Sequence, residues 1–155
     1  MVLAVQNLRV QYGARVLFND LSFTVEDGER IALAGHNGAG KSTFARCLCG
    51  LDKRALGELE LNGHSYRAKQ RCHISYLVMQ DVNHQLFTED VLDELLLSMD
   101  GEDEKENTEW ANQILSSLDL AAKIKLHPMS LSGGEKQRVA IGSAIASNKE
   151  ILVFD

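Results

Sequence analysis

Apolar and polar residues follow two different periods along the chain. Up to residue 34, short apolar runs are separated by turn signals, a pattern that predicts strands. These runs are Val2–Val5, Leu8–Val10, Leu21–Val25 and Arg30–Ala34. The last run is apolar on both faces, which is typical of a buried strand in a parallel sheet. Lys41–Leu51 then reads as a helix, ended by Gly50 and the charged run 52–54.

After two further strands, the pattern of apolar residues changes to a helical period. Glu58–Leu61 and Ile74–Met79 still read as strands. From Thr88 the apolar positions recur at helical spacing and predict two helices. Their stripes are Val91, Leu92, Leu95, Leu96 and Met99, and then Trp110, Ala111, Ile114, Leu115 and Leu118. The acidic stretch 100–109 between them is interpreted as a solvated connector, with a docking surface as the alternative. A final buried strand, Ile151–Phe154, leads into Asp155.

Composition and charge narrow the function classes. With 155 residues, 45% of them apolar and 25% charged, the chain has the composition of one globular domain. A formal net charge of -6 argues against a nucleic-acid partner. No secretory signal is recognised at the N-terminus, so the cytoplasm is the expected compartment.

A glycine-rich loop, Gly35–Ser42, joins the predicted strand at 30–34 to the predicted helix at 41–51. Its spacing of Gly35, four residues, Gly40, Lys41 and Ser42 matches a P-loop. Backbone N–H groups of such a loop surround phosphates, the lysine adds a positive charge, and the hydroxyl can ligate magnesium. A dinucleotide fingerprint requires Gly-x-Gly-x-x-Gly, which is not found here, so hydride chemistry is a poor candidate. We therefore expect a site for ATP and Mg²⁺.

A second motif, Leu131–Arg138, opens another predicted helix. Ser132 and Glu135 have the spacing of a capping box, which is a purely structural explanation. A cap does not require Gly133 and Gly134 between its partners, since a stronger helix former would serve better there. Two glycines leave the amides at the helix start open to an anion.

Together these motifs resemble the nucleotide-binding domain of ATP-binding-cassette (ABC) proteins. The resemblance rests on the P-loop, on Gln80 after a strand, on the signature Leu131–Gln137 and on a strand ending in Asp155. It implies an α/β fold with a three-layer P-loop core, an antiparallel β subdomain and an inserted helical subdomain, truncated at the C-terminus. The implied division assigns 1–81 and 136–155 to the core with its β subdomain, and 82–135 to the helical signature subdomain.

The resemblance also implies roles for individual residues. Tyr12 would stack on adenine, although an ordinary strand-end tyrosine remains the alternative. Gln80 would reach the magnesium and the attacking water, and Asp155 would hold the magnesium through water. Nucleotide would be bound by Asn37, Gly38, Ala39, Gly40, Lys41, Ser42 and Thr43, with Ser42 also a magnesium ligand. Ser132, Gly133 and Gly134 would contact ATP on a second copy of the domain, in a homodimer or a heterodimer.

Departures from the family pattern limit the expected activity. Asp155 matches the Walker B aspartate of the family, which is followed by a water-polarising glutamate, and here the sequence stops at Asp155. We therefore interpret the chain as an N-terminal portion that binds ATP and hydrolyses it poorly by itself.

The stretch Met79–Phe87 resembles the ATPase subunits of energy-coupling-factor and cobalt-type importers, except that Val82 replaces a usual proline. This implies ATP-driven uptake of a vitamin or metal ion by an ATPase that is bound to a transmembrane subunit at the inner face of the cell membrane. The alternative is a soluble ABC ATPase, such as a translation factor or an assembly ATPase, without a membrane partner.

Overall fold

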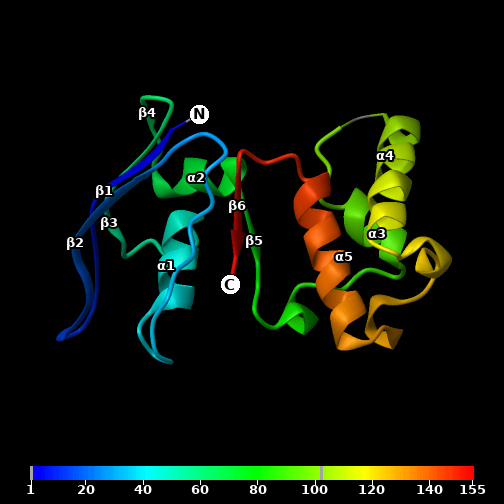
Figure 1. Ribbon diagram of the computed structural model, residues 1–155, viewed down its shortest axis with the longest axis horizontal. Helices are drawn as coiled ribbons and strands as arrows, with labels where there is room; N and C mark the ends of the chain where they lie inside the picture. The colour runs from blue at the N-terminus through cyan, green and yellow to red at the C-terminus, as the bar shows by residue number, and fades with distance from the viewer. Residues whose placement is uncertain (1, 102) are drawn as a thin grey trace. The chain divides into compact units, whose positions relative to one another are not determined.

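The computed structural model describes residues 2–101 and 103–155. The chain forms two compact units, Met1–Ser75 and Tyr76–Asp155 (Figure 1). No helix in the described ranges is long and apolar enough to cross a membrane.

The first unit is built on an antiparallel sheet with the strand order β2-β1-β3-β4. Its strands are β1 (Leu3–Tyr12), β2 (Arg15–Val25), β3 (Leu56–Leu61) and β4 (His64–Ser65). The sequence predicts two strands where the single strand β1 lies. A register irregularity divides β1 at Asn7, whose φ is 52°, so the break in the sequence pattern is a bulge within one strand.

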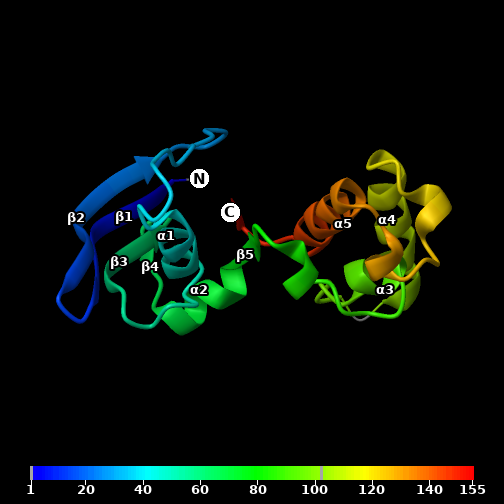
Figure 2. The same cartoon turned by 90° about the horizontal axis from the view of Figure 1, so that it is seen from below.

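Two helices accompany this sheet, α1 (Lys41–Leu48) and α2 (Ala68–Ile74) (Figure 2). The buried ring of Phe44 fixes α1 to β2, with ring centroids 5.8 Å from both Phe18 and Phe23. The predicted helix at 41–51 is confirmed and ends three residues earlier than expected. Helix α2 was not predicted, because its seven residues are too few to establish a helical stripe.

The predicted buried strand Arg30–Ala34 is wrong for this structure. Residues 30–34 form no strand, and the side chains of Ile31 and Leu33 are 53% and 48% exposed. A strand that is apolar on both faces is stable only with strands at its edges and layers over its faces. None of the described strands pairs with this segment, so its apolar side chains remain uncovered.

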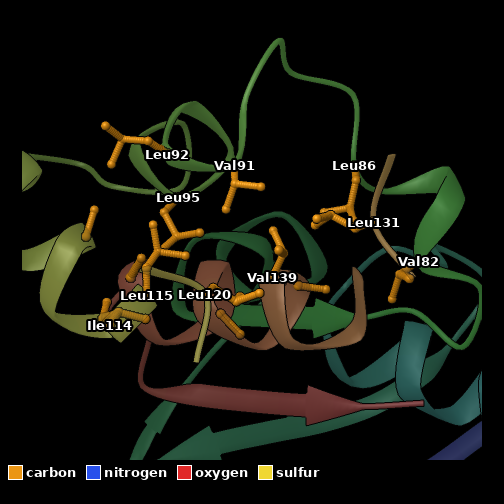
Figure 3. Close-up of a cluster of buried hydrophobic side chains, with 14 of the residues drawn as sticks. Val82, Leu86, Val91, Leu92, Leu95, Ile114, Leu115, Leu120, Leu131 and Val139 are labelled. Atoms are coloured by element: carbon orange, nitrogen blue, oxygen red, sulfur yellow. The ribbon is translucent and has the colours of Figure 1, made fainter. Parts of the chain in front are cut away.

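The second unit combines the helices α3 (Val91–Leu96), α4 (Glu104–Ser117) and α5 (Gly133–Ala146) with the strand pair β5 (Ser75–Val78) and β6 (Ile151–Phe154). Short 3-10 turns lie at η1 (Val82–His84), η2 (Ala121–Lys123) and η3 (Pro128–Ser130). The three helices pack on one another around a cluster of buried side chains that includes Leu95, Leu115 and Val139 (Figure 3). A Cβ at Gly142 would lie 3.2 Å from Leu118, so this glycine permits the close approach of α5.

Two expectations in this unit need correction. Most of the acidic stretch 100–109, predicted as a connector, belongs to α4, which begins at Glu104. Asp103 caps this helix by accepting hydrogen bonds from the N–H groups of Lys105 and Glu106. Acidic residues in a first helical turn are favoured by the helix dipole, which explains the difference; residue 102 lies outside the described residues. Trp110, placed on the apolar stripe, is 45% exposed, and α4 buries Ala111, Ile114 and Leu115 instead.

The predicted division of the chain into a core with its β subdomain (1–81 and 136–155) and a helical signature subdomain (82–135) stays a prediction. In the structure α5 packs against α3 and α4.

Candidate functional site

The loop Gly35–Ser42 leads into α1, which begins at Lys41, as the sequence predicts. Gly38 and Gly40 have φ values of 83° and 95°, a left-handed backbone that favours glycine. Gly40 is the N-cap residue of α1 and supplies no side-chain cap. The first N–H groups of a helix point away from its body, so the start of α1, which has no side-chain cap, presents the positive end of a helix dipole. An anion fits this arrangement.

Lys41 lies across this loop. Its ammonium donates to the carbonyl oxygens of Gly35 at 2.7 Å and His36 at 3.2 Å. An ammonium has three N–H donors, so both bonds are compatible with a third to a phosphate oxygen. Arg15, at the start of β2, donates from Nη2 to the Gly38 carbonyl at 3.2 Å. The β1–β2 hairpin is therefore fastened to the loop by a residue that the sequence analysis did not identify.

Tyr12 lies at the same end of that hairpin, paired with Arg15 in the strand register. Its hydroxyl donates to Asp52 Oδ2, and the Arg54 guanidinium lies over its ring, 4.1 Å from the centroid. Arg54 also pairs with Asp52 through Nε at 3.1 Å and Nη2 at 3.2 Å. The sequence analysis read residues 52–54 only as a helix-ending charged run.

Charge and hydrogen bonding fix the proton positions in this cluster. The Arg54 bonds, followed by the Tyr12 bond, hold the pKa of Asp52 well below its usual range. The same Asp52 bond, helped by burial, raises the pKa of Tyr12. At neutral pH the carboxylate is therefore the acceptor and the phenol is the donor.

In the second unit, Gln80 and Asp155 follow the ends of neighbouring strands. The backbone N–H of Asp155 donates to the Val78 carbonyl at 3.0 Å, and Gln80 comes two residues after Val78. The structure thus brings these two predicted magnesium-site residues to one edge of the β5–β6 pair.

Two side chains hold the segment after Gln80. Gln85 Oε1 accepts from the Met79 N–H at 3.0 Å, and its Nε2 donates to the Leu77 carbonyl at 3.1 Å. Asn83 Oδ1 accepts from Lys136 Nζ in α5 at 2.9 Å. Sequence reasoning assigned no role to these contacts, because they join residues whose proximity depends on the folded unit.

The predicted capping box at α5 is confirmed. Ser132 Oγ accepts from the Glu135 N–H at 3.4 Å, and the Ser132 N–H donates to Glu135 Oε2 at 2.8 Å. Glu135 Oε1 also pairs with Lys123 Nζ at 2.8 Å. The hydrogen bond from Lys123, followed by those from Ser132, lowers the pKa of Glu135 to about 2.

The two glycines inside this cap have no structural requirement of their own. A Cβ added to Gly133 or Gly134 meets no atom within 4 Å, and neither residue has a positive φ. Alanine would favour the helix by up to about 1 kcal/mol per residue. The fold of the chain therefore does not explain these glycines, and an approaching ligand would.

The donor atoms of the predicted magnesium site are chemically suitable. Ser42 offers a hydroxyl, Gln80 an amide oxygen and Asp155 a carboxylate, and all three residues are exposed. Hard divalent cations such as Mg²⁺ prefer oxygen donors of these kinds. Ser42 belongs to the first unit, and Gln80 and Asp155 to the second; their assembly with Lys41 and the signature residues into one site stays a prediction.

Comparisons with known proteins identify the relatives of the chain. A family model described as ABC transporter matches residues 18–155. A putative ABC transporter ATP-binding protein of Treponema denticola is 42% identical over 98% of this chain and 30% of that protein. The energy-coupling factor transporter ATP-binding protein EcfA1 of Fusobacterium nucleatum is 35% identical over 99% of this chain and 61% of that protein.

A solved structure supports the fold. CbiO1 from Clostridium perfringens, described as part of the ABC transporter complex cbiONQ, matches with a TM-score of 0.85 at 23% identity. The match covers 99% of this chain and 64% of that one, and it confirms the predicted fold class. The chain thus spans less than two thirds of each of these relatives.

Proposed function

The chain belongs to the ABC transporter family, and from this we propose that it is the ATP-binding part of an importer ATPase. The observation that carries the proposal is the geometry of the loop Gly35–Ser42, with Gly38 and Gly40 left-handed and Lys41 across the loop. Several relatives are named as ATP-binding proteins of energy-coupling factor transporters, and this favours the importer over a soluble ABC ATPase.

In this proposal the residues of the chain bind and orient the nucleotide. Amides of the loop and of the first turn of α1 receive the β- and γ-phosphates, and the Lys41 ammonium adds a charge-assisted bond. Magnesium, held by Ser42, Gln80 and Asp155, supplies neutralisation of the charge that develops on the phosphates. Gln80 also orients the attacking water, and Tyr12 stacks on the adenine base.

Gly133 and Gly134 support a dimeric arrangement. We place Ser132, Gly133 and Gly134 against the γ-phosphate of ATP bound to a second ATPase domain, so that two domains enclose two nucleotides. The open space at both glycines is what a phosphate approaching the backbone of α5 requires. ATP then favours the closed dimer, because both domains contact the nucleotide, and hydrolysis allows the dimer to open.

Replacing Gly134 by alanine separates this role from folding. Gly134→Ala should leave the thermal stability of the full-length protein unchanged or slightly raised, since its Cβ meets no atom. ATP-dependent association should weaken by roughly tenfold, because the methyl group occupies the path of the phosphate. Analytical ultracentrifugation with and without ATP measures this. Gly63→Ala adds a methyl group at an open glycine of the first unit and is the control for association alone, because its positive φ of 78° makes it less stable. Equal association of both variants contradicts the dimer proposal.

The transport role predicts a membrane partner. We expect the full-length protein, isolated from detergent-solubilised membranes, to co-purify with a transmembrane subunit. After reconstitution into liposomes, that complex should transport a vitamin or a metal ion across the membrane when ATP is supplied. Mass spectrometry of the purified complex identifies the subunit. Recovery with ribosomes and without any membrane protein would instead support the soluble alternative.

A further inference from the structure

The predicted base-stacking residue Tyr12 belongs to a cluster of three side chains, with Asp52 and Arg54. Asp52 is 6% exposed and accepts four hydrogen bonds, from the Tyr12 hydroxyl and from the N–H, Nε and Nη2 groups of Arg54. Burying a carboxylate is costly unless it is paired and hydrogen-bonded. The cluster meets this condition, and its two opposite charges balance.

The cluster determines how the Tyr12 ring is held. Two attachments act on the ring at once: the hydroxyl is anchored to Asp52, and the Arg54 guanidinium covers one face at 4.1 Å. A tyrosine on the last residue of a strand would otherwise rotate about χ1. With the hydroxyl fixed and one face covered, only the other face remains for a stacking partner.

The cluster is also placed beside the phosphate loop. Tyr12 pairs with Arg15, and Arg15 donates to the Gly38 carbonyl of the loop. Asp52 follows α1, the helix that the loop opens, and its own N–H bonds back to the Arg46 carbonyl at 3.3 Å. The ring, its two supports and the loop therefore all belong to the first unit.

We propose that Asp52 and Arg54 are positioning residues for the nucleotide base: Asp52 fixes the Tyr12 ring, and Arg54 covers one face so that a purine stacks on the opposite face. This inference rests on the proposed ATP site and extends it to two residues outside the phosphate loop. A cation over one face of an aromatic ring is attracted by the ring quadrupole, and Asp52 keeps that cation in place. The raised pKa of Tyr12 agrees with a phenol that stays protonated and anchored.

The test measures how tightly the full-length protein binds two ligands, ATP and inorganic tripolyphosphate, each in the presence of Mg²⁺. Both contain the phosphates, and only ATP contains the base. Arg54→Ala and Asp52→Ala should each weaken ATP binding by about three- to tenfold and leave tripolyphosphate binding unchanged. A merely structural role would weaken both ligands together. Arg54→Lys, which keeps a cation, should restore part of the ATP affinity.

Lys53→Ala is the matched control, because Lys53 is an exposed cation at the adjacent position; its affinity for both ligands should equal that of the wild type. If the wild-type protein binds neither ligand, the ATP site is wrong and this inference is overturned with it. If the wild type binds both, and Arg54→Ala weakens both equally or neither, only the positioning role is overturned. A rise in ATP affinity in Arg54→Ala also overturns it, because Arg54 would then occupy the face that the base requires.

Discussion

Lys41→Ala is expected to weaken ATP binding by about 100-fold, the largest loss for any single side chain of the loop. The ammonium lies across the loop, bonded to Gly35 at 2.7 Å and His36 at 3.2 Å, where it can meet a phosphate. Hydrogen bonds to charged groups are among the strongest in proteins, and losing one with its charge costs up to about 3 kcal/mol. Isothermal titration calorimetry with ATP and Mg²⁺ measures the change.

The fold should survive this substitution. Lys41 is only half-buried at the start of α1, and the helix packs through its buried residues Phe44, Ala45 and Cys47. Circular dichroism and the thermal midpoint should therefore match those of the wild type. Lys53→Ala removes the same charge from an exposed position and should bind ATP normally. Unchanged ATP affinity in Lys41→Ala would overturn the assignment of Lys41.

Features governed by a few neighbouring residues could be predicted from the sequence. The helix start at Lys41 depends on the glycines before it, and the capping box at α5 depends on Ser132 and Glu135, three positions apart. Both are confirmed, because backbone conformation at a helix start is set locally. The strands β3, β5 and β6 are also confirmed, because each of these short apolar runs pairs with a strand: β3 with β1, and β5 with β6.

Features governed by distant residues could not be predicted. The segment 30–34 has the composition of a central strand, but a strand forms only where neighbours complete its hydrogen bonds. The contact of Tyr12 with Asp52 spans 40 positions, and that of Asn83 with Lys136 spans 53. Each depends on how strands and helices pack, which no local pattern in the sequence reports. The candidate site was therefore predicted as a set of motifs, without the side chains that support them.

Gly50→Ala is expected to destabilise the first unit by about 3 kcal/mol or more. Gly50 ends α1 in a Schellman motif: its N–H donates to the Cys47 carbonyl at 3.1 Å, and the Leu51 N–H donates to the Arg46 carbonyl at 2.9 Å. Its φ is +71°, and a Cβ there would lie 2.0 Å from the carbonyl oxygen of Ala68, at the start of α2. The substitution therefore combines left-handed strain, about 1–2 kcal/mol, with an overlap of backbone atoms that no rotamer relieves.

Gly63→Ala separates these two causes. Gly63 has a similar φ of +78°, but a Cβ there meets no atom within 4 Å, so only the strain of about 1–2 kcal/mol remains. Urea denaturation of the full-length protein gives the two free energies, and amide hydrogen exchange should show faster opening of α1 and α2 in Gly50→Ala alone. Equal destabilisation by the two substitutions would mean that α1 and α2 do not approach each other as closely as the structure shows. Because Asp52 lies two residues after Gly50, Gly50→Ala should also weaken ATP binding, through displacement of Asp52 and not through any contact of its own.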